Sequence, residues 1–331
     1  MPSQQPALSI VIVTLGGVRE LGVALPGILA QTIANKIELL VVARSGSVTS
    51  SDLAEISGLH SVRLIELPSI GNRGRDAAAG VAEAGSPFIA LHENHTRAEP
   101  ETFERLIAAF RPGDAALCPV IYPANGDMIW GNAMYAIAHA DAAPPNTDRD
   151  RATLTLHNAV YRTELLRPFG EKLASESRVQ TELGAMGKSL RFLPGTVVWH
   201  INEARPKRVL GDSFALGRDF GYTRSRAMGL YERAGRAALL PAIAAKNMLR
   251  CMANSHRSAA TRQIFLRSTL PVMGAALAFA TGEVRGYFDR KSAWSEIDEL
   301  HEFHVRGRLN GRSPALLWLA EAIRDLPKGA P

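Results

Sequence analysis

The sequence predicts an α/β protein in which a mostly parallel β-sheet is flanked by helices and followed by a helical C-terminal extension. Apolar runs of strand length alternate with helical patterns in the first half of the chain, an order typical of parallel sheets with crossover helices. The 331 residues suffice for one large domain and an extension, and 46% hydrophobic and 21% charged residues are ordinary globular values. From residue 205 onward the pattern is helical and basic.

The first elements have clear signals. The run "LSIVIVTLGG" predicts a buried strand followed by a glycine turn, and "VRELGVALPGILAQT" places leucine and isoleucine at helical spacing. A second buried strand, "IELLVVARSGS", ends in a Ser/Gly turn, and "SDLAEISG" predicts a short helix with serine and aspartate at its start.

The following segments continue the alternation of strands and helices. A strand, an alanine-rich helix, a strand and a helix are predicted in turn by "VRLIEL", "GRDAAAGVAEAG", "PFIAL" and "EPETFERLIAAFRPG". Further along, a strand, a helix and a pair of strands around Pro194-Gly195 are predicted by "TLTLHNAVYR", "SESRVQTELGAMG" and "SLRFLPGTVVWH".

Polar residues directly follow three of the predicted strands. Because ligands of parallel α/β sheets bind at the carboxyl ends of the strands, we expect a site formed by residues 14–17, 44–47 and 92–95. No GxGxxG follows the first strand and the chain has no GxxxxGK[ST], which disfavours a dinucleotide fold and P-loop chemistry.

The sequence "HENH" at the end of the fourth strand has the chemistry of a metal site. Glu93 and His95 alternate along an extended segment and are therefore expected to point the same way. A carboxylate oxygen and an imidazole suit Mn²⁺, and more weakly Mg²⁺. Two other interpretations of His95 stay open here: direct contact with a phosphate, or capping of the following helix.

Charge and composition favour some partners over others. The chain carries a net charge of +6, and residues 205–267 hold 13 Lys/Arg against 3 Asp/Glu. Basic residues mixed with apolar ones at helical spacing are typical of helices that lie on an anionic membrane leaflet, although a solvated face or a subunit contact such as a homodimer would show the same pattern. A nucleic-acid binder is disfavoured, because only 6% of the residues are aromatic and no zinc-ligand spacing occurs.

The cellular location is predicted from what the sequence lacks. Two cysteines give no disulfide framework, the first residues lack the pattern of a secretory signal, and no apolar run reaches the ~18 residues of a membrane span. We therefore expect a cytoplasmic protein that is peripheral on the inner face of the plasma membrane.

The order of the motifs resembles family 2 glycosyltransferases with the GT-A fold, a Rossmann-like sheet flanked by helices. The resemblance rests on "SIVIVT", "LAQT", "HNAVYR", Glu176 and "GKSLRFLPGTVVWH", and extends over residues 8–200. In particular it resembles a bacterial branch with Glu-x-His in place of the Asp-x-Asp metal motif. It implies a catalytic domain at residues 1–204 that binds nucleotide-sugar and acceptor, followed by a basic, mainly helical extension at 205–331. The mixture of basic and apolar residues in this extension predicts membrane association.

The resemblance also implies an activity and a partner. A sugar would pass with inversion from a UDP- or GDP-sugar class donor to a hydroxyl of a lipid, a lipid-linked glycan or a surface polysaccharide. Arg44-Ser45-Gly46-Ser47 stands where the family has Asp-Asp-Gly-Ser, and this departure together with Glu-x-His favours a second interpretation, a GT-A-like binding or regulatory protein without transfer activity.

Carried over to this chain, the family's motifs imply a role for each matching residue. The general base is Glu176. The metal, Mn²⁺ or Mg²⁺, is held by Glu93, His95 and His200. The acceptor is contacted by Asn158, Arg162 and Trp199. The donor is contacted by Thr14, Leu15, Arg44, Ser45, Arg75, Asp76, Glu93, Asn94 and His95.

Structural interpretations of some of these residues stay open from the sequence. Glu176 at a helix start also favours the helix dipole, and Arg75 and Asp76 are equally typical of a solvated helix start. Alternation along the predicted strand puts Asn158 and Arg162 on one face, as a polar strand edge would also do. Trp199 is also typical of core packing.

Overall fold

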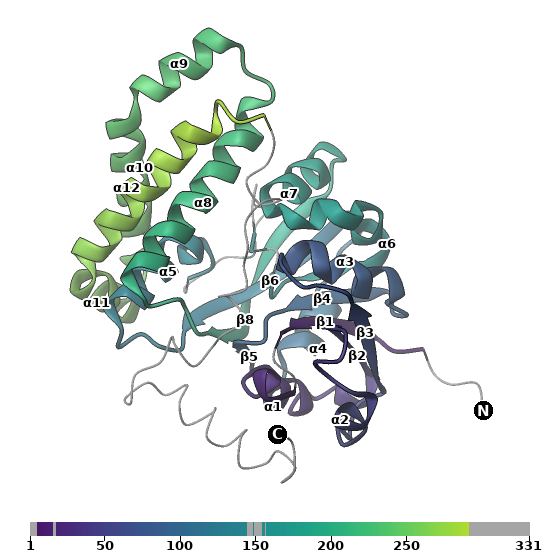
Figure 1. Cartoon of the computed structure of the whole chain (residues 1–331). Coiled ribbons are helices and arrows are strands. Elements are labelled where there is room, and N and C mark those ends of the chain that lie inside the picture. The colour runs from purple at the N-terminus through teal and green to yellow at the C-terminus, as the bar shows by residue number, and fades with distance from the viewer. Residues whose placement is uncertain (1–4, 16–17, 144–147, 149–153, 156, 291–331) are drawn as a thin grey trace.

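The computed structural model describes residues 5–15, 18–143, 148, 154–155 and 157–290 (Figure 1). Its sheet has eight strands in the order β3-β2-β1-β4-β7-β6-β8-β5. The strands are β1 (Leu8–Thr14), β2 (Ile37–Arg44), β3 (Ser61–Leu67), β4 (Phe88–His92), β5 (Thr96–Ala98), β6 (Asp114–Pro123), β7 (Val160–Arg162) and β8 (Ser189–His200).

Helices surround the sheet and continue beyond it. Those connecting the strands are α1 (Ala24–Leu29), α2 (Ser50–Ala54), α3 (Arg73–Glu83), α4 (Thr102–Ala108), α5 (Ile129–Ala138), α6 (Thr163–Leu166) and α7 (Glu176–Ala185). Those following the last strand are α8 (Pro206–Ser225), α9 (Leu230–Ala238), α10 (Leu240–Ser255), α11 (Ala259–Arg267) and α12 (Thr269–Gly286). The predicted α/β class with a C-terminal helical extension is confirmed.

The N-terminal half of the sheet is parallel. Strand β1 pairs with β2 and β4, and β2 pairs with β3, all in parallel, so the carboxyl ends of these strands share one edge as expected. Strand β7 runs antiparallel to β4 and β6, and β5 antiparallel to β8. The last pairing sets Thr96 opposite His200 and brings the end of β8 to the segment after β4.

Alternating side chains of the parallel strands fill two cores, one on each face. On one face Val11 and Val13 of β1 pack with residues of α3 and α7, and on the other Ile10 and Ile12 pack with residues of α1, α2 and α4. Each such side chain contributes about 1.5–3 kcal/mol when fully buried. The strands are fixed in place by apolar packing on both sides, which makes their carboxyl edge a rigid support.

The C-terminal helices form a third core that takes in α5 from the middle of the chain. Ala133 and Ile137 of α5 pack with residues such as Val209 of α8 and Val272 of α12. Figure 1 shows α5 beside α8, α11 and α12, away from the strands β1 to β3. The division into domains at 1–204 and 205–331 stays a prediction, and residues 291–331 lie outside the described part.

Several elements differ from those predicted. The pair of strands expected at 189–200 is one strand, β8, whose pairing with β6 shifts register between Pro119 and Val120, and Gly195 takes φ 79° there. Within the described residues, the strand expected in "TLTLHNAVYR" spans only β7, because Asn158 adopts φ 71°. Strands β5 and β6 and helix α5 were not predicted.

None of the helices in the described residues is, taken singly, long and apolar enough to cross a membrane. One pair that bends by 83°, Thr261–Arg267 with Thr269–Gly286, meets that criterion by length and composition.

Candidate active site

Four segments distant in the sequence meet at the carboxylate of Glu93, which is buried directly after β4. Arg73 Nη1 lies 2.5 Å from Glu93 Oε1. The other oxygen, Oε2, accepts a hydrogen bond of 2.7 Å from Asn158 Nδ2 and lies 3.0 Å from His200 Nε2. His95 Nε2 is 3.8 Å from that same oxygen. The structure therefore brings together Glu93, His95, His200 and Asn158 of the predicted site.

The start of α3 positions Arg73. Asn72 caps this helix by accepting from the Arg75 amide, and the Asp76 carboxylate accepts from the amides of Gly71 (2.6 Å) and Asn72 (2.9 Å). Gly74 packs so closely on the backbone of Leu173 that a Cβ would overlap it. Asp76 thus binds the loop before α3 and fixes the direction in which Arg73 leaves it.

Asn158 is placed by its backbone as well as its side chain. Its amide donates to the Leu91 carbonyl at 2.6 Å, and its Oδ1 accepts from Thr96 Oγ1 at 2.9 Å. These bonds hold the residue in the left-handed region, which asparagine tolerates better than most residues. The side-chain amide is therefore directed at Glu93 by contacts from two neighbouring segments.

The electrostatics favour an ionised Glu93 among neutral or cationic partners. Burial alone would raise its pKa, but the Arg73 guanidinium and the His95 and His200 imidazoles hold the pKa of Glu93 well below its ordinary range. Burial lowers the pKa of His92 to about 4, so this imidazole is neutral at pH 7. The resulting pair of Arg73 and Glu93 is an ion pair enclosed by protein.

Glu93, His95 and His200 have the spacing of a cation site. One ligand atom from each lies within 4.8 Å of the others, and one oxygen with two imidazole nitrogens suits Mn²⁺. A metal on His200 Nε2 would replace the contact of that nitrogen with Glu93, because the same lone pair cannot be both protonated and coordinated. His200 Nδ1 is a buried nitrogen without a hydrogen-bond partner among the described residues. One carboxylate and two imidazoles at this spacing are a donor set that fits a divalent metal.

The interpretation of His95 as a helix cap is wrong. The segment after it is the strand β5, and α4 begins only at Thr102. His95 Nδ1 lies 2.9 Å from the Oδ1 of Asn94, which places Asn94 beside the imidazole, and both residues are buried.

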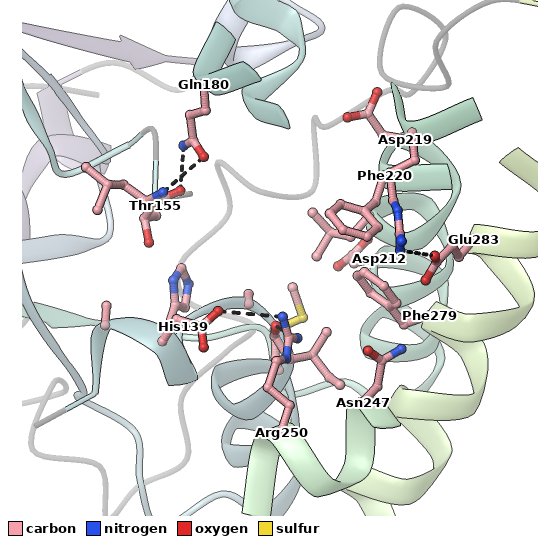
Figure 2. Close-up of a pocket in the computed structure, with 18 of the residues that line it drawn as sticks. His139, Thr155, Gln180, Asp212, Asp219, Phe220, Asn247, Arg250, Phe279 and Glu283 are labelled. Carbon is pink, nitrogen blue, oxygen red and sulfur yellow. Dashed lines mark hydrogen bonds and ion pairs between the residues drawn. The ribbon is translucent and has the colours of Figure 1, made fainter. Parts of the chain in front are cut away.

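A cavity of about 440 Å³ opens beside Glu93 and Arg73. Figure 2 shows its two sides: His139 and Thr155 face Phe220 and Phe279, which belong to α8 and α12. His139 also contacts the site directly, since its ring centroid is 4.3 Å from that of His200. The C-terminal helices thus form one wall of the cavity that Glu93 also lines.

The predicted base, Glu176, is the first residue of α7, and its side chain lies outside the described part. Its neighbour Ser175 is described: the Ser175 Oγ accepts from the Arg178 amide and donates to the Asp219 carboxylate at 2.9 Å. Asp219 lines the cavity. The helix that begins with Glu176 is therefore tied at its start to α8 and to the cavity wall.

Two residues predicted to bind the acceptor lie away from Glu93. Arg162 pairs with Phe88, at the opposite end of β4, and its guanidinium donates to the carbonyls of Asp114 (3.0 Å) and Arg111 (3.2 Å). The expectation that Arg162 shares a strand face with Asn158 is wrong, because Asn158 is outside the strand.

The side chain of Trp199 points away from the cavity because side chains alternate along a strand. It neighbours His200 in β8 and so points to the other face of the strand. Its ring stacks on Tyr122 at 5.1 Å, and its Nε1 donates to Glu99 Oε1 at 3.2 Å. The structure therefore gives Trp199 a packing role and separates it from the cavity.

The remaining predicted donor residues lie along the carboxyl edge of the sheet. Thr14 is buried at the end of β1 beside half-buried Leu15, and Arg44 is exposed at the end of β2. Ser45 Oγ donates to the Leu67 carbonyl, and Arg75 Nε donates to Asp76. None of these six residues lines the cavity at Glu93, and their roles stay predictions.

Arg73 lies at the site, although the sequence predicts Arg75 there and not Arg73. Successive helical residues turn by about 100°, so two residues apart point to nearly opposite sides, and only one of the two arginines can face Glu93. The available signal was Asn72, a good N-cap, which places Arg73 in the first turn next to the strand edge. Asp219 and His139 had no sequence signal.

Comparison with known proteins finds similarity only among solved structures. No protein-family model and no curated protein matches the chain. S. aureus TarS is 14% identical with a TM-score of 0.45, covering 81% of this chain and 54% of TarS, so the chain spans about half its length. TarS 1-349 in complex with UDP-GlcNAc is 13% identical with a TM-score of 0.45, covering 84% of this chain and 90% of that one.

A third similar structure is GalNAc-T7 with UDP, GalNAc and Mn²⁺, which is 13% identical with a TM-score of 0.45 and covers 60% of this chain and 44% of that one. At these TM-scores, the function of this chain has to be inferred from its own residues.

Stability is expected to fall as the pH is lowered from about 6.5 to 4, because His92 is buried in its neutral form. Its pKa is about 4 in the folded chain and 6.5 ordinarily, so the unfolded chain binds more protons in this window. The free energy of unfolding therefore rises with pH there, by about 3 kcal/mol in full. Below pH 4.5, protonation of Glu93 removes further stability, because its folded pKa is depressed.

Urea unfolding of metal-free protein across this pH range measures the effect. His92→Leu, which cannot titrate, should make the free energy of unfolding nearly independent of pH between pH 4 and 6.5. It should keep the further loss of stability below that range, which comes from Glu93. An equal slope in both proteins would show that another group causes it.

Proposed function

We propose that this protein is an inverting glycosyltransferase of the GT-A type that uses a nucleotide-sugar donor. The observation that carries the proposal is the buried cluster of Glu93, Arg73, His95 and His200 at the carboxyl edge of the sheet, open to a cavity of about 440 Å³. Transfer from a nucleotide-sugar requires cationic groups at the departing diphosphate and an enclosed place for the acceptor. This edge supplies both.

Each residue of this cluster has a proposed role that follows from its chemistry. Arg73 presents a fixed positive charge at the cavity, and Glu93 keeps it in place. A divalent metal, when bound, would be held by Glu93, His95 and His200 and would neutralise charge on the leaving diphosphate. Asn158 orients the Glu93 carboxylate through its side-chain amide.

Glu176 takes the proton of the acceptor hydroxyl in this proposal. Support comes from its place at the start of α7, which Ser175 and Asp219 fix against the cavity wall. A carboxylate base deprotonates the attacking hydroxyl as the sugar–phosphate bond breaks on the opposite side, which gives inversion. The acceptor is a hydroxyl of a lipid, a lipid-linked glycan or a surface polysaccharide.

Glu176→Gln is expected to lower the rate of transfer by about 10²–10⁴-fold while leaving donor affinity nearly unchanged, because general-base catalysis contributes about that factor. Glu182→Gln is the matched control on the same helix, since Glu182 pairs with Lys172 and Arg178 at the surface. Transfer rates and donor Kd of both variants decide the assignment. Full activity of Glu176→Gln would remove Glu176 from the mechanism.

A thermal-shift panel of nucleotides and nucleotide-sugars, with and without Mn²⁺, tests the function itself. UDP and UDP-GlcNAc come first because similar structures contain them, and GDP-sugars follow. A ligand that binds the folded chain raises Tm. At a concentration 100 times its Kd, it adds about 2.7 kcal/mol to the free energy of unfolding. Absence of any shift across UDP- and GDP-sugars would contradict the proposal.

A binding or regulatory protein without transfer activity is the second candidate. The observation that favours it is that Glu93 already has a cationic partner in Arg73, so the carboxylate has no need of a metal for charge balance. This candidate predicts a thermal shift with a nucleotide-sugar but neither hydrolysis nor transfer of it with Mn²⁺ or Mg²⁺.

A further inference from the structure

Exposed apolar side chains concentrate on the C-terminal helices. The described residues include thirteen large hydrophobic side chains that are exposed, and ten of these lie between residues 230 and 288. They are Leu230, Tyr231, Leu239, Leu249, Met252, Leu266, Leu270, Met273, Leu277 and Phe288. Large apolar side chains that gather on the exposed surface of one part of a folded chain mark a contact with something else.

Helix α12 shows the pattern most clearly, because it is apolar on two sides. Val272 and Phe279 are buried in the core formed with α5 and α8. Leu270, Met273 and Leu277 follow one another at helical spacing on the other side and are 78%, 51% and 53% exposed. A helix that is apolar all round requires a second apolar environment beyond the core it packs on.

The same helices carry the positive charge of the molecule. Residues 230–288 contain eight Lys/Arg and two acidic residues. Two of these arginines pair with acids outside that range, Arg250 with Asp141 and Arg285 with Asp289. Of the two acids within the range, Glu283 is buried against Arg224, and Glu232 pairs with Arg236. Arg262 and Arg267 are exposed on α11, and so is the apolar side chain of Leu266 on the same helix.

We propose that the surface of α9 to α12 docks on an anionic membrane leaflet. Apolar side chains enter the headgroup region while arginines and lysines meet lipid phosphates, the arrangement that favours interfacial helices. A second copy of this chain is a poorer partner for this surface, because two positively charged surfaces would then face each other. Figure 1 shows α9, α10 and α12 in the part of the helical unit that lies away from β1 to β3.

The docking surface is continuous with the cavity at Glu93. Leu239 is 56% exposed and also lines that cavity, together with Ile243 of α10 and Phe279 of α12. A hydroxyl acceptor held in the membrane would therefore reach the cavity along the helices that contact the lipid. Membrane binding itself does not depend on the proposed transfer, so either can fail without the other.

Flotation of the full chain with vesicles tests the inference. Binding is expected to vesicles of phosphatidylcholine mixed with phosphatidylglycerol and to be much weaker with phosphatidylcholine alone. Arg262→Gln combined with Arg267→Gln should weaken binding about thirty-fold, since each cation near the surface adds about a factor of five. The triple variant Leu270→Ser, Met273→Ser, Leu277→Ser should weaken it at least about ten-fold.

Met186→Ser is the matched control, because Met186 is 59% exposed but follows α7 beside the sheet. It should bind vesicles as the wild type does. Circular dichroism melting curves distinguish a variant that has lost its fold from one that has lost only vesicle binding. If the triple variant does not fold, the arginine variant, which removes only exposed charge, tests the inference alone.

Three outcomes would overturn the inference. They are no binding to the anionic vesicles, equal binding of wild type and both variants, and an oligomer that the triple variant dissociates while neither protein binds vesicles. The last would identify the surface as a contact between copies of this chain.

Discussion

Glu93→Ala is expected to lower the free energy of unfolding by about 3 kcal/mol, because it removes the partner of an enclosed cation. The Arg73 side chain is 16% exposed and lies 2.5 Å from the Glu93 carboxylate. Without Glu93, the guanidinium keeps its charge and loses the group that offsets its desolvation. Asn158 loses its acceptor as well. Urea unfolding of both proteins measures the difference.

The effect should depend on the charge and less on the shape of the site. Glu93→Gln keeps an oxygen for Asn158 but is expected to be nearly as destabilising as the alanine variant. Combining it with Arg73→Met should restore most of the loss, because no charge then remains buried. Glu101→Ala is the control: its pair with Arg105 is 64% and 56% exposed, and a change within about 0.5 kcal/mol is expected.

The same variants decide between a metal site and an ion pair. If Glu93, His95 and His200 hold Mn²⁺, the ion should raise the Tm of the wild type and not that of Glu93→Gln. An equal Mn²⁺ shift in the two proteins would show that the ion binds elsewhere. If Mn²⁺ leaves the Tm of the wild type unchanged but a UDP-sugar raises it, the diphosphate would be bound by Arg73 and the histidines directly.

The sequence located Glu93 and His95 because a local pattern places them, whereas His200 was predicted as a ligand from the resemblance to family 2 glycosyltransferases. A buried strand must end where its apolar run ends, so "HENH" was bound to lie at the carboxyl edge. Arg73 could not be chosen over Arg75 in the same way, because the choice depends on the angle at which α3 leaves its loop. That angle is set by the Asp76 hydrogen bonds and by the contact of Gly74 with Leu173.

The prediction that Arg162 binds the acceptor beside Asn158 fails for a related reason. Alternation assumes an unbroken strand, and Asn158 interrupts it with a positive φ that its hydrogen bonds to Leu91 and Thr96 stabilise. Those bonds are tertiary and leave no pattern in the neighbouring sequence. Likewise, the packing of α5 with the C-terminal helices joins segments over 60 residues apart, which no local periodicity reveals.

Gly282→Ala is expected to destabilise the protein by about 3 kcal/mol or more, because α8 and α12 cross in backbone contact. A Cβ on Gly282 would overlap the carbonyl of Phe214, and one on Gly217 would overlap that of Phe279. The obstacle in both cases is main chain of the other helix, which cannot rotate away as a side chain can. Relief requires that the two helices separate along their length.

Gly211→Ala on the same helix α8 is the matched control, since a Cβ there meets no atom within 4 Å. Alanine is the better helix former by about 1 kcal/mol, so this variant should be neutral or slightly stabilised. Equal urea midpoints for Gly211→Ala and Gly282→Ala would contradict the close crossing. Because α8 and α12 carry Phe220 and Phe279, separation of the helices would also open one wall of the cavity that Glu93 also lines, and ligand binding there should fall together with stability.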